Sequence, residues 1–334
     1  MRTKWLVTLL CTMAIVSLVT GCGSKETAGT PAESTATEET VIEENAEPAT
    51  TQEVADEEMV AEDVVTEETT EEAVKEESPE ELLAKGKELQ EAENYEEAFT
   101  CFTKAEELGN AEAAYYVGYA YHYGNGVTAD TSKAVEMYQK AADNNVIDAL
   151  AMMGYLYQTG EIEVIAKDDA KSVEMYEKAA ELGSTRAMGT LGIMYEIGIA
   201  VEPSAEMAME WYQKKAQAGD PSGYYDIGNM YLWGAEGLVE IDENKAIEWF
   251  EKAANENVPE AMNELGMIYS SSATVGDDVK AFEWFQKGAD AGNSDAMWNL
   301  GNMYFHGIGT EADADKAKEW YDKHVKAGGM NPEY

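Results

Sequence analysis

A two-part segment built around a glycine recurs six times in the C-terminal two thirds of this 334-residue chain. The recurring glycines stand 35 to 38 residues apart, at Gly118, Gly154, Gly192, Gly228, Gly266 and Gly301. Each has a small residue five positions before it, an apolar residue one before it and a tyrosine three after it. A fixed period of this length indicates a solenoid, in which each unit buries its apolar face only against neighbouring units.

Each unit is expected to form two helices. In the first, residues at positions −5, −4, −1, +2 and +3 from the glycine follow a 3.6-residue period and are expected to face the core. A glycine inside a helix costs about 1 kcal/mol relative to alanine, so six in register predict a close approach between helices. In the second helix, a large pair of residues follows a small residue by three positions. Asp242, Asp277 and Asp313 are its expected N-caps in three units.

Two sequence runs carry a family resemblance: LG-x-x-Y-x-x-G in the first helix and KA-x-EW[YF]-x-KAA-x-x-G in the second. With these runs the chain resembles the Sel-one-like repeat (SLR) family, a branch of the tetratricopeptide (TPR) superfamily. The resemblance implies an all-α fold, a right-handed α-solenoid of antiparallel helix pairs, and a protein–protein interaction function without catalysis. A shared fold does not identify the partner, which must be argued from a site.

The repeats divide most of the chain into units. Six SLR units are expected over residues 111–329, at 111–146, 147–184, 185–220, 221–258, 259–293 and 294–329. Residues 79–110 form a shorter helical pair whose spacing fits an ordinary TPR better, and they are interpreted as a TPR-like capping repeat. Residues 330–334 form a C-terminal tail without a further solvating helix. The last unit is therefore expected to expose apolar surface, which would allow self-association.

The N-terminal part of the chain has a different composition. Arg2 and Lys4 precede an apolar run over residues 5–19, and Val-Thr-Gly-Cys at 19–22 matches a bacterial lipobox. This looks like a lipoprotein signal peptide over residues 1–22, with lipid attachment (palmitate among the acyl groups) at Cys22; a retained anchor helix is the alternative. Residues 23–78 are expected to be a disordered linker, since 20 acidic and 2 basic residues fall within 23–80.

Charge and composition exclude several functions. The formal net charge is −43 for the whole chain, of which −27 belongs to residues 81–334. This charge argues against nucleic acid as a partner, because binding to phosphates needs a basic face. Cys101 would be the only cysteine of the folded part, so no intramolecular disulfide is expected. The three histidines lack metal-site spacing, and no nucleophile elbow or phosphate loop occurs, so no catalytic, cofactor-binding or metal residues are expected.

A candidate binding face lies opposite the core stripe, at positions −6, −3, +1, +4 and +5 of each first helix. In TPR relatives this face lines a concave groove that holds peptides, and exposed aromatic residues are enriched at binding hot spots. The alternative is that these rings pack between repeats. The candidate partner-binding residues are Tyr115, Tyr119, His122, Tyr123, Tyr155, Tyr225, Asn229, Trp233, Trp298, Asn302, Phe305 and His306.

Together these features predict a scaffold or adaptor tethered to the outer face of a bacterial membrane. It would bind a protein or peptide partner in its groove, and the residues after the lipobox favour a Gram-positive host. The alternative function is recognition of cell-wall glycan or peptide fragments, in which the aromatic rings would stack on sugars with Asn and Gln nearby.

Overall fold

The computed structural model describes residues 77–161, 164–235 and 238–330. The chain divides into two compact units, Met1–Glu76 and Glu77–Tyr334, and the description below concerns the second. The expected signal peptide, Cys22, nearly all of the acidic linker and most of the C-terminal tail therefore lie outside the described residues.

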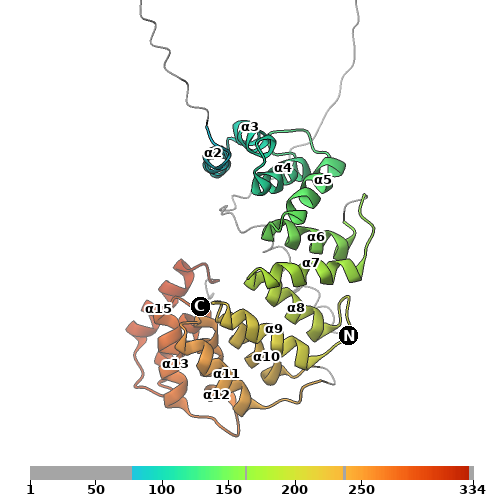
Figure 1. The fold of residues 1–334 in the computed structure, drawn as a ribbon. Coiled ribbons are helices and arrows are strands. Elements are labelled where there is room, and N and C mark those ends of the chain that lie inside the picture. Colours follow the sequence, from blue (N-terminus) through green and yellow to red (C-terminus); the bar gives the residue numbers. More distant parts are fainter. Residues whose placement is uncertain (1–76, 162–163, 236–237, 331–334) are drawn as a thin grey trace, which may run out of the picture. The chain divides into compact units, whose positions relative to one another are not determined.

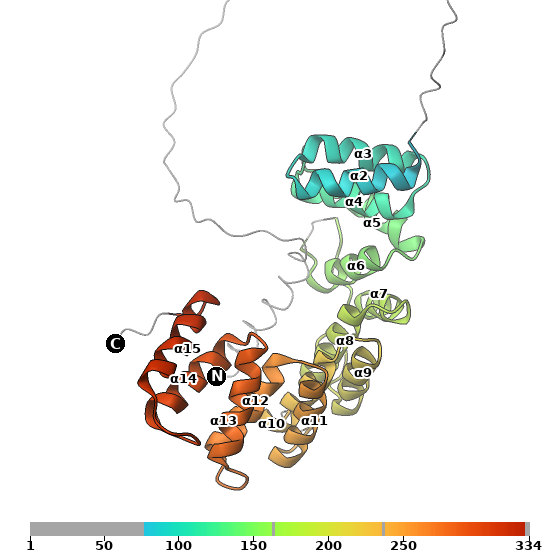
Figure 2. The same cartoon turned by 90° about the vertical axis from the view of Figure 1, so that its left-hand side faces the viewer.

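The described part of the chain is all-α and contains no β-strand, which confirms the expected fold class. Each repeat is one pair of helices, and each pair contacts the pair before and after it in chain order (Figures 1 and 2). The helices are α2 (Pro79–Glu91), α3 (Tyr95–Glu107), α4 (Ala111–Tyr123), α5 (Thr131–Asp143), α6 (Ile147–Thr159), α7 (Asp169–Glu181), α8 (Thr185–Ile197), α9 (Ala205–Gln217), α10 (Ser222–Trp233), α11 (Glu243–Asn255), α12 (Pro259–Ser271), α13 (Asp278–Asp290), α14 (Ser294–His306) and α15 (Ala314–Lys326).

The recurring glycine lies against an aromatic ring of the second helix in its own unit. A Cβ atom on Gly228 would stand 2.5 Å from the Phe250 ring, and one on Gly192 would overlap the ring of Tyr212. The same contact joins Gly86 to Phe102 in the first helix pair, α2 and α3. The close helix approach expected from the glycines is thus confirmed, and its partner is a specific buried ring.

A second repeated contact fixes the connection between the two helices of a unit. The tyrosine three residues after the glycine accepts a hydrogen bond at its carbonyl oxygen from the N-cap residue of the second helix, over 2.7–2.9 Å. The bond is present in all six units although the connecting loops differ in length. Its pairs are Tyr121 with Asp130, Tyr157 with Asp168, Tyr195 with Ser204, Tyr231 with Asp242, Tyr269 with Asp277 and Tyr304 with Asp313.

The N-caps themselves follow the sequence pattern. Asp242, Asp277 and Asp313 accept backbone N–H bonds at the start of α11, α13 and α15, which confirms their expected role. In five units a lysine three residues after the cap lies over the ring of the tyrosine at 5.0–5.1 Å, as Lys245 does over Tyr231. The cap, lysine and tyrosine therefore form one structural cluster per unit, and they leave the opposite face of the first helix open.

The C-terminal end of the array agrees with the expectation only in part. The exposed positions of α15 are mainly charged, including Lys316, Lys318, Asp322 and Lys326, and Val325 is its only large apolar residue more than a third exposed. The exposed apolar surface expected of the last unit is therefore found mainly at Phe305 and Ile308, 57% and 39% exposed, and little of it lies on α15. None of the described helices is long and apolar enough to span a membrane.

Candidate functional site

The residues of the predicted binding face lie in different packing environments in the structure. At position −3 the aromatic side chain packs on the second helix of its own unit. The ring centroids are 5.8 Å apart for Tyr115 and Tyr138, 5.6 Å for Tyr225 and Phe250, and 4.8 Å for Trp298 and Tyr321. These three predicted residues therefore have a packing role, within the repeat rather than between repeats.

The rings of the first two SLR units mostly contact one another. Tyr123 lies 4.5 Å from Tyr119 and stacks on His122 at 4.4 Å, measured between ring centroids. His122 Nδ1 is 3.3 Å from the Tyr138 hydroxyl, and the Tyr155 hydroxyl donates to Glu161 over 2.5 Å. Burial lowers the pKa of His122 and raises that of Tyr123 to about 12. His122 and Tyr155 therefore have hydrogen-bond partners within the chain, and Tyr123 is 41% exposed.

The remaining predicted polar residues on this face also have partners. Asn302 accepts a hydrogen bond from the Tyr321 hydroxyl over 2.8 Å. Burial raises the pKa of Tyr225, and a hydrogen bond with Asn229 opposes that rise. Phe305 and His306 meet edge to face at 4.9 Å, and the Phe305 side chain is 57% exposed.

A pocket of about 410 Å³ opens between α10, α12 and α14. Two of the predicted residues, Trp233 and Trp298, line it, although they come from the fourth and the sixth SLR units. Trp233 is 72% exposed, the most exposed aromatic side chain of the described residues. The residues that line the pocket are Leu232, Trp233, Glu243, Asn263, Glu264, Met267, Ile268, Ser271, Asp295, Trp298 and Asn299.

The polar groups of this pocket are acidic or neutral. Glu264, Asp295 and Glu243 contribute carboxylates, and no lysine, arginine or histidine is among the lining residues. Burial, followed by the charge of Asp295, raises the pKa of Glu264. Hydrogen bonds from Ser272 and Thr274 lower the pKa of Glu243, which keeps it ionised. The pocket therefore combines exposed indole surface with negative charge.

Part of this lining was not predicted from the sequence. Glu264 and Asn299 stand at position −2, which had been assigned neither to the core nor to the binding face. Asn299 Nδ2 donates to Asn263 Oδ1 over 3.0 Å, so the two amides join α14 to α12 beneath the pocket. A signal was present in the sequence: position −2 is polar in the last three units, with Asp226, Glu264 and Asn299. Asp295, at position −6, belongs to the predicted face but was not singled out.

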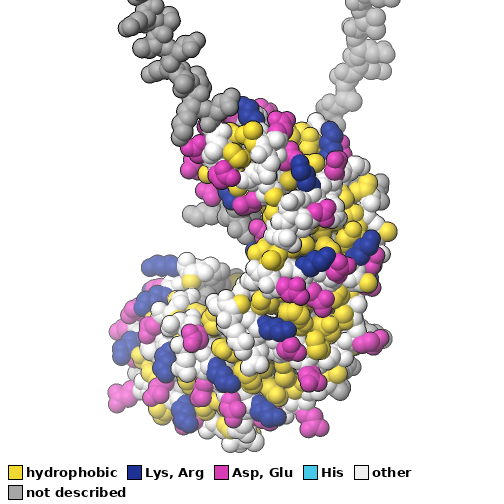
Figure 3. Space-filling view, in the orientation of Figure 1, with side chains coloured by type: hydrophobic (Ala, Val, Ile, Leu, Met, Phe, Trp, Pro, Cys, Tyr) yellow, Lys and Arg dark blue, Asp and Glu magenta, His cyan; other side chains and the backbone are white. Residues whose placement is uncertain are grey.

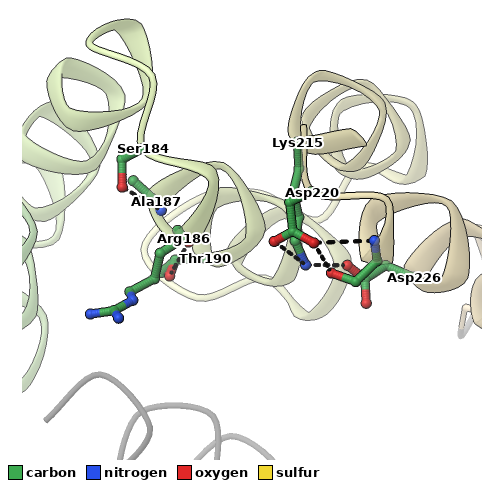
Figure 4. A network of polar contacts seen from close by, with 8 residues as sticks. Ser184, Arg186, Ala187, Thr190, Lys215, Asp220 and Asp226 are labelled. Atoms are coloured by element: carbon green, nitrogen blue, oxygen red, sulfur yellow. Dashed lines mark hydrogen bonds and ion pairs between the residues drawn. The ribbon is translucent and has the colours of Figure 1, made fainter. Parts of the chain in front are cut away.

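A partly buried ion pair lies in the middle of the array, between α9 and α10 (Figure 4). Lys215 Nζ is 2.9 Å from Asp226 Oδ2 and 3.9 Å from Asp220 Oδ2. Burial raises the pKa of the Asp226 carboxyl, and the charge of Lys215 opposes that rise. The ion pair joins the third unit to the fourth.

Apolar side chains gather on the face shown in Figure 3 around α6 to α9, with acidic side chains between them.

Replacing Glu196 with glutamine should change how stability depends on pH. Glu196 accepts a hydrogen bond from the Tyr212 hydroxyl over 2.7 Å, and burial raises its pKa above the ordinary value. Since a raised carboxyl pKa means that the folded state holds the proton more tightly, stability falls as pH rises between the two pKa values. The glutamine keeps an acceptor for Tyr212 and removes that fall. Relative to wild type, the variant should gain up to about 1.4 kcal/mol per pH unit within the window. Urea denaturation over a pH series measures this, and a difference that stays constant with pH would contradict it.

Within the described residues, no group of three or more His, Cys, Asp or Glu side chains is placed to hold a metal ion. Cys101 is buried and has no disulfide partner there. The expectation that the protein has no catalytic residues stays a prediction.

The fold and its pocket define a class of protein, the helical-repeat solenoids in which paired helices present an open face. The Sel1 repeat model matches residues 81–110, 111–146, 147–184, 185–220, 221–258, 259–293 and 294–328, and the chain therefore belongs to the Sel1 repeat family. The match over 81–110 makes that helix pair a seventh Sel1 repeat, whereas its spacing had suggested an ordinary TPR.

Solved structures support the same classification. A protective antigen of uropathogenic Escherichia coli strains, which displays an SLR fold, is 30% identical with a TM-score of 0.56, over 75% of this chain and 54% of that one. A Sel1 repeat protein from Oxalobacter formigenes is 29% identical with a TM-score of 0.55, over 76% of this chain and 98% of that one.

A curated relative resembles a shorter stretch. The ERAD-associated E3 ubiquitin-protein ligase component HRD3A of Arabidopsis thaliana is 35% identical over 69 residues. The matched stretch spans 21% of this chain and 10% of that relative.

Proposed function

We propose that this protein is a non-catalytic interaction scaffold that binds a segment of a partner protein in the pocket between α10, α12 and α14. Sel1 repeat proteins are generally scaffolds for protein interactions, and the related HRD3A is by its name a component of a larger ligase. The proposal adds the place on the molecule where the partner binds.

One observation carries the proposal: Trp233 is 72% exposed at the edge of a pocket that a second tryptophan also lines. Apolar surface left in water costs about 25 cal/mol per Å², so covering an indole ring favours association. Tryptophan is among the residues most enriched at binding hot spots, which lie in pockets surrounded by weaker contacts. The other predicted aromatic residues are packed against their own repeats or against one another, apart from Phe305 and the partly exposed Tyr123.

Affinity capture from solubilised envelopes tests this function. Trp233→Ala should reduce the captured partner at least tenfold while leaving the melting temperature unchanged, because the side chain contributes little to the core. Val279→Ala is the matched control, since Val279 is 56% exposed on α13 and lies outside the pocket lining. Equal capture by both variants would contradict the proposal.

The alternative, recognition of cell-wall glycan or peptide fragments, would use the same pocket. Its support is the presence of two indole rings beside the amides of Asn263 and Asn299. Saturable binding of glycan fragments, lost in Trp233→Ala and accompanied by no captured protein, would favour this alternative.

The proposed location is the outer face of a bacterial membrane, where the protein would act as a lipid-anchored adaptor. It is supported by the lipobox at residues 19–22 and by the acidic segment that follows, which would hold the solenoid away from the membrane. Self-association through the last repeat stays a prediction, and the proposal does not include it.

Replacing Cys22 with serine should abolish lipid attachment and release the protein from the membrane fraction. Labelling cells with a fatty-acid analogue and fractionating them measures both effects. Cys101→Ser serves as the control and should keep the label, because Cys101 is buried in the solenoid core. Retention of label and membrane association by Cys22→Ser would contradict the anchor.

A further inference from the structure

We propose that the partner segment places the cationic side chain of an arginine or lysine into the pocket lined by Trp233, Trp298 and Glu264. This inference rests on the proposed function, because it specifies the chemistry of the partner at the same pocket. It commits to a basic peptide segment as the occupant.

The tryptophans of the second helices and the tryptophans of the pocket differ in one respect, which indicates this chemistry. Each tryptophan of a second helix has a lysine from the same helix over its ring, with the lysine Nζ atom 3.5–4.0 Å from the ring centroid. The four pairs are Trp211 with Lys214, Trp249 with Lys252, Trp284 with Lys287 and Trp320 with Lys323. In the described part of the chain, Trp233 and Trp298 are the tryptophans without such a lysine, and both line the pocket. The ring of Trp298 packs on Tyr321 and His324, at 4.8 and 5.5 Å between ring centroids, whereas Trp233 is 72% exposed. A cation over an indole ring is therefore a contact that this fold makes repeatedly, and the exposed ring of Trp233 is available for it at the pocket.

The charge of the pocket favours the same occupant. The carboxylates of Glu264, Asp295 and Glu243 face a space in which no lining residue is basic. Glu264 is partly withdrawn from water, and the charge of Asp295 opposes its ionisation further. A guanidinium or ammonium group that enters the pocket would offset both effects, because a nearby opposite charge favours the ionised carboxylate. A guanidinium also donates to carboxylates and stacks on aromatic faces, so arginine fits better than lysine.

The occupant must come from outside this chain. Residues 23–80 contain 20 acidic and 2 basic residues, and residues 81–334 carry a net charge of −27. The chain's own acidic segment, and the bulk of a second copy, would therefore be repelled by the pocket. A basic segment of a different protein is complementary to it in charge, and such complementarity speeds encounter and suppresses wrong partners.

Isothermal titration calorimetry with short blocked peptides tests this inference. The probes are a glycine-flanked diarginine peptide and its dilysine, diglutamine and diglutamate counterparts. Wild-type protein should bind diarginine saturably, dilysine more weakly, and the other two not at all. Trp233→Ala and Glu264→Gln should each weaken the diarginine affinity at least tenfold. Glu136→Gln, which removes an exposed carboxylate from α5, should change it less than twofold.

Four results would overturn the inference. One is an equal loss of affinity in Glu264→Gln and Glu136→Gln, which would mean attraction to the overall charge. Another is equal binding of the neutral peptide or of glycan fragments, and the third is a dimer that covers the pocket without peptide. If Glu264→Gln unfolds the protein, Asp295→Asn takes its place. Capture of a partner that depends on Trp233 but not on Glu264 or Asp295 would overturn this inference and leave the proposed function standing.

Discussion

Replacing Lys215 with methionine should lower the free energy of unfolding by about 1–3 kcal/mol, between the cost of breaking a surface ion pair and that of breaking a fully buried one. The Lys215 side chain is only 14% exposed and its Nζ atom lies 2.9 Å from Asp226 Oδ2. Without the ammonium group, the partly buried Asp226 carboxylate has no close cation, since among the described residues only Lys215 pairs with it. Chemical denaturation followed by circular dichroism measures the change.

The sign of the pH dependence is part of this prediction. Burial already raises the pKa of Asp226, and loss of Lys215 should raise it further. Because a carboxyl that is protonated in the folded state needs no cation, the deficit should be larger at neutral pH than in acid. Lys178→Met is the matched control: Lys178 pairs with Glu174 on the surface, where the expected cost is below about 1 kcal/mol. Equal losses in the two variants would contradict the account.

Replacing Gly192 with alanine should lower the free energy of unfolding by about 1–3 kcal/mol, although alanine is the better helix former. The added Cβ atom would overlap the ring of Tyr212, which is itself buried in the core. Neither the ring nor the helix backbone can move without disturbing the neighbouring unit, so the overlap should outweigh the gain in helix propensity.

The control for Gly192 lies one turn earlier in the same helix. A Cβ atom on Gly189 would meet Lys215 at 3.5 Å, an ordinary van der Waals contact. Gly189→Ala should therefore stabilise the protein by about 0.5–1 kcal/mol, because only the helix propensity changes. The two variants should differ in sign in the same urea titration. A gain in stability from both variants would show that the contact with the Tyr212 ring is not the reason why position 192 requires a glycine.

Much of the fold could be predicted because each unit repeats the same local chemistry. The glycine, the tyrosine three residues later and the N-cap of the next helix specify a contact within about forty residues. The structure confirms that contact in each unit, as for Gly301 with Tyr321 and Tyr304 with Asp313. Six copies in register leave few alternatives to a solenoid.

The binding face was harder to predict because a helix in a solenoid has neighbours on several sides. Position −3 lies only about 60° around the helix from the glycine, given 3.6 residues per turn. A large ring there, such as Trp298, reaches the second helix of its own unit and becomes partly buried. Position +5 lies further round, and there Trp233 remains exposed. Dividing the first helix into a core face and an exposed face could not distinguish position −3, which packs, from position +5, which stays exposed.

The pocket itself depends on contacts that a periodic pattern does not contain. Its lining comes from three successive units, and Glu264 faces it from a position at the border between the core and the exposed face. The sequence shows that Trp233 and Trp298 stand at open positions, but their convergence with Asn263 and Glu264 follows from the stacking of α10, α12 and α14.

Photo-crosslinking in living cells tests the central claim most directly. A photoreactive residue at position 267 replaces Met267, which is 42% exposed and lines the pocket; a second variant carries it at position 279, which is exposed but outside the lining. The account predicts that position 267 crosslinks to a discrete partner protein, that Trp233→Ala abolishes this product, and that position 279 gives none. Crosslinks of equal yield from both positions, or a product that persists in Trp233→Ala, would contradict it.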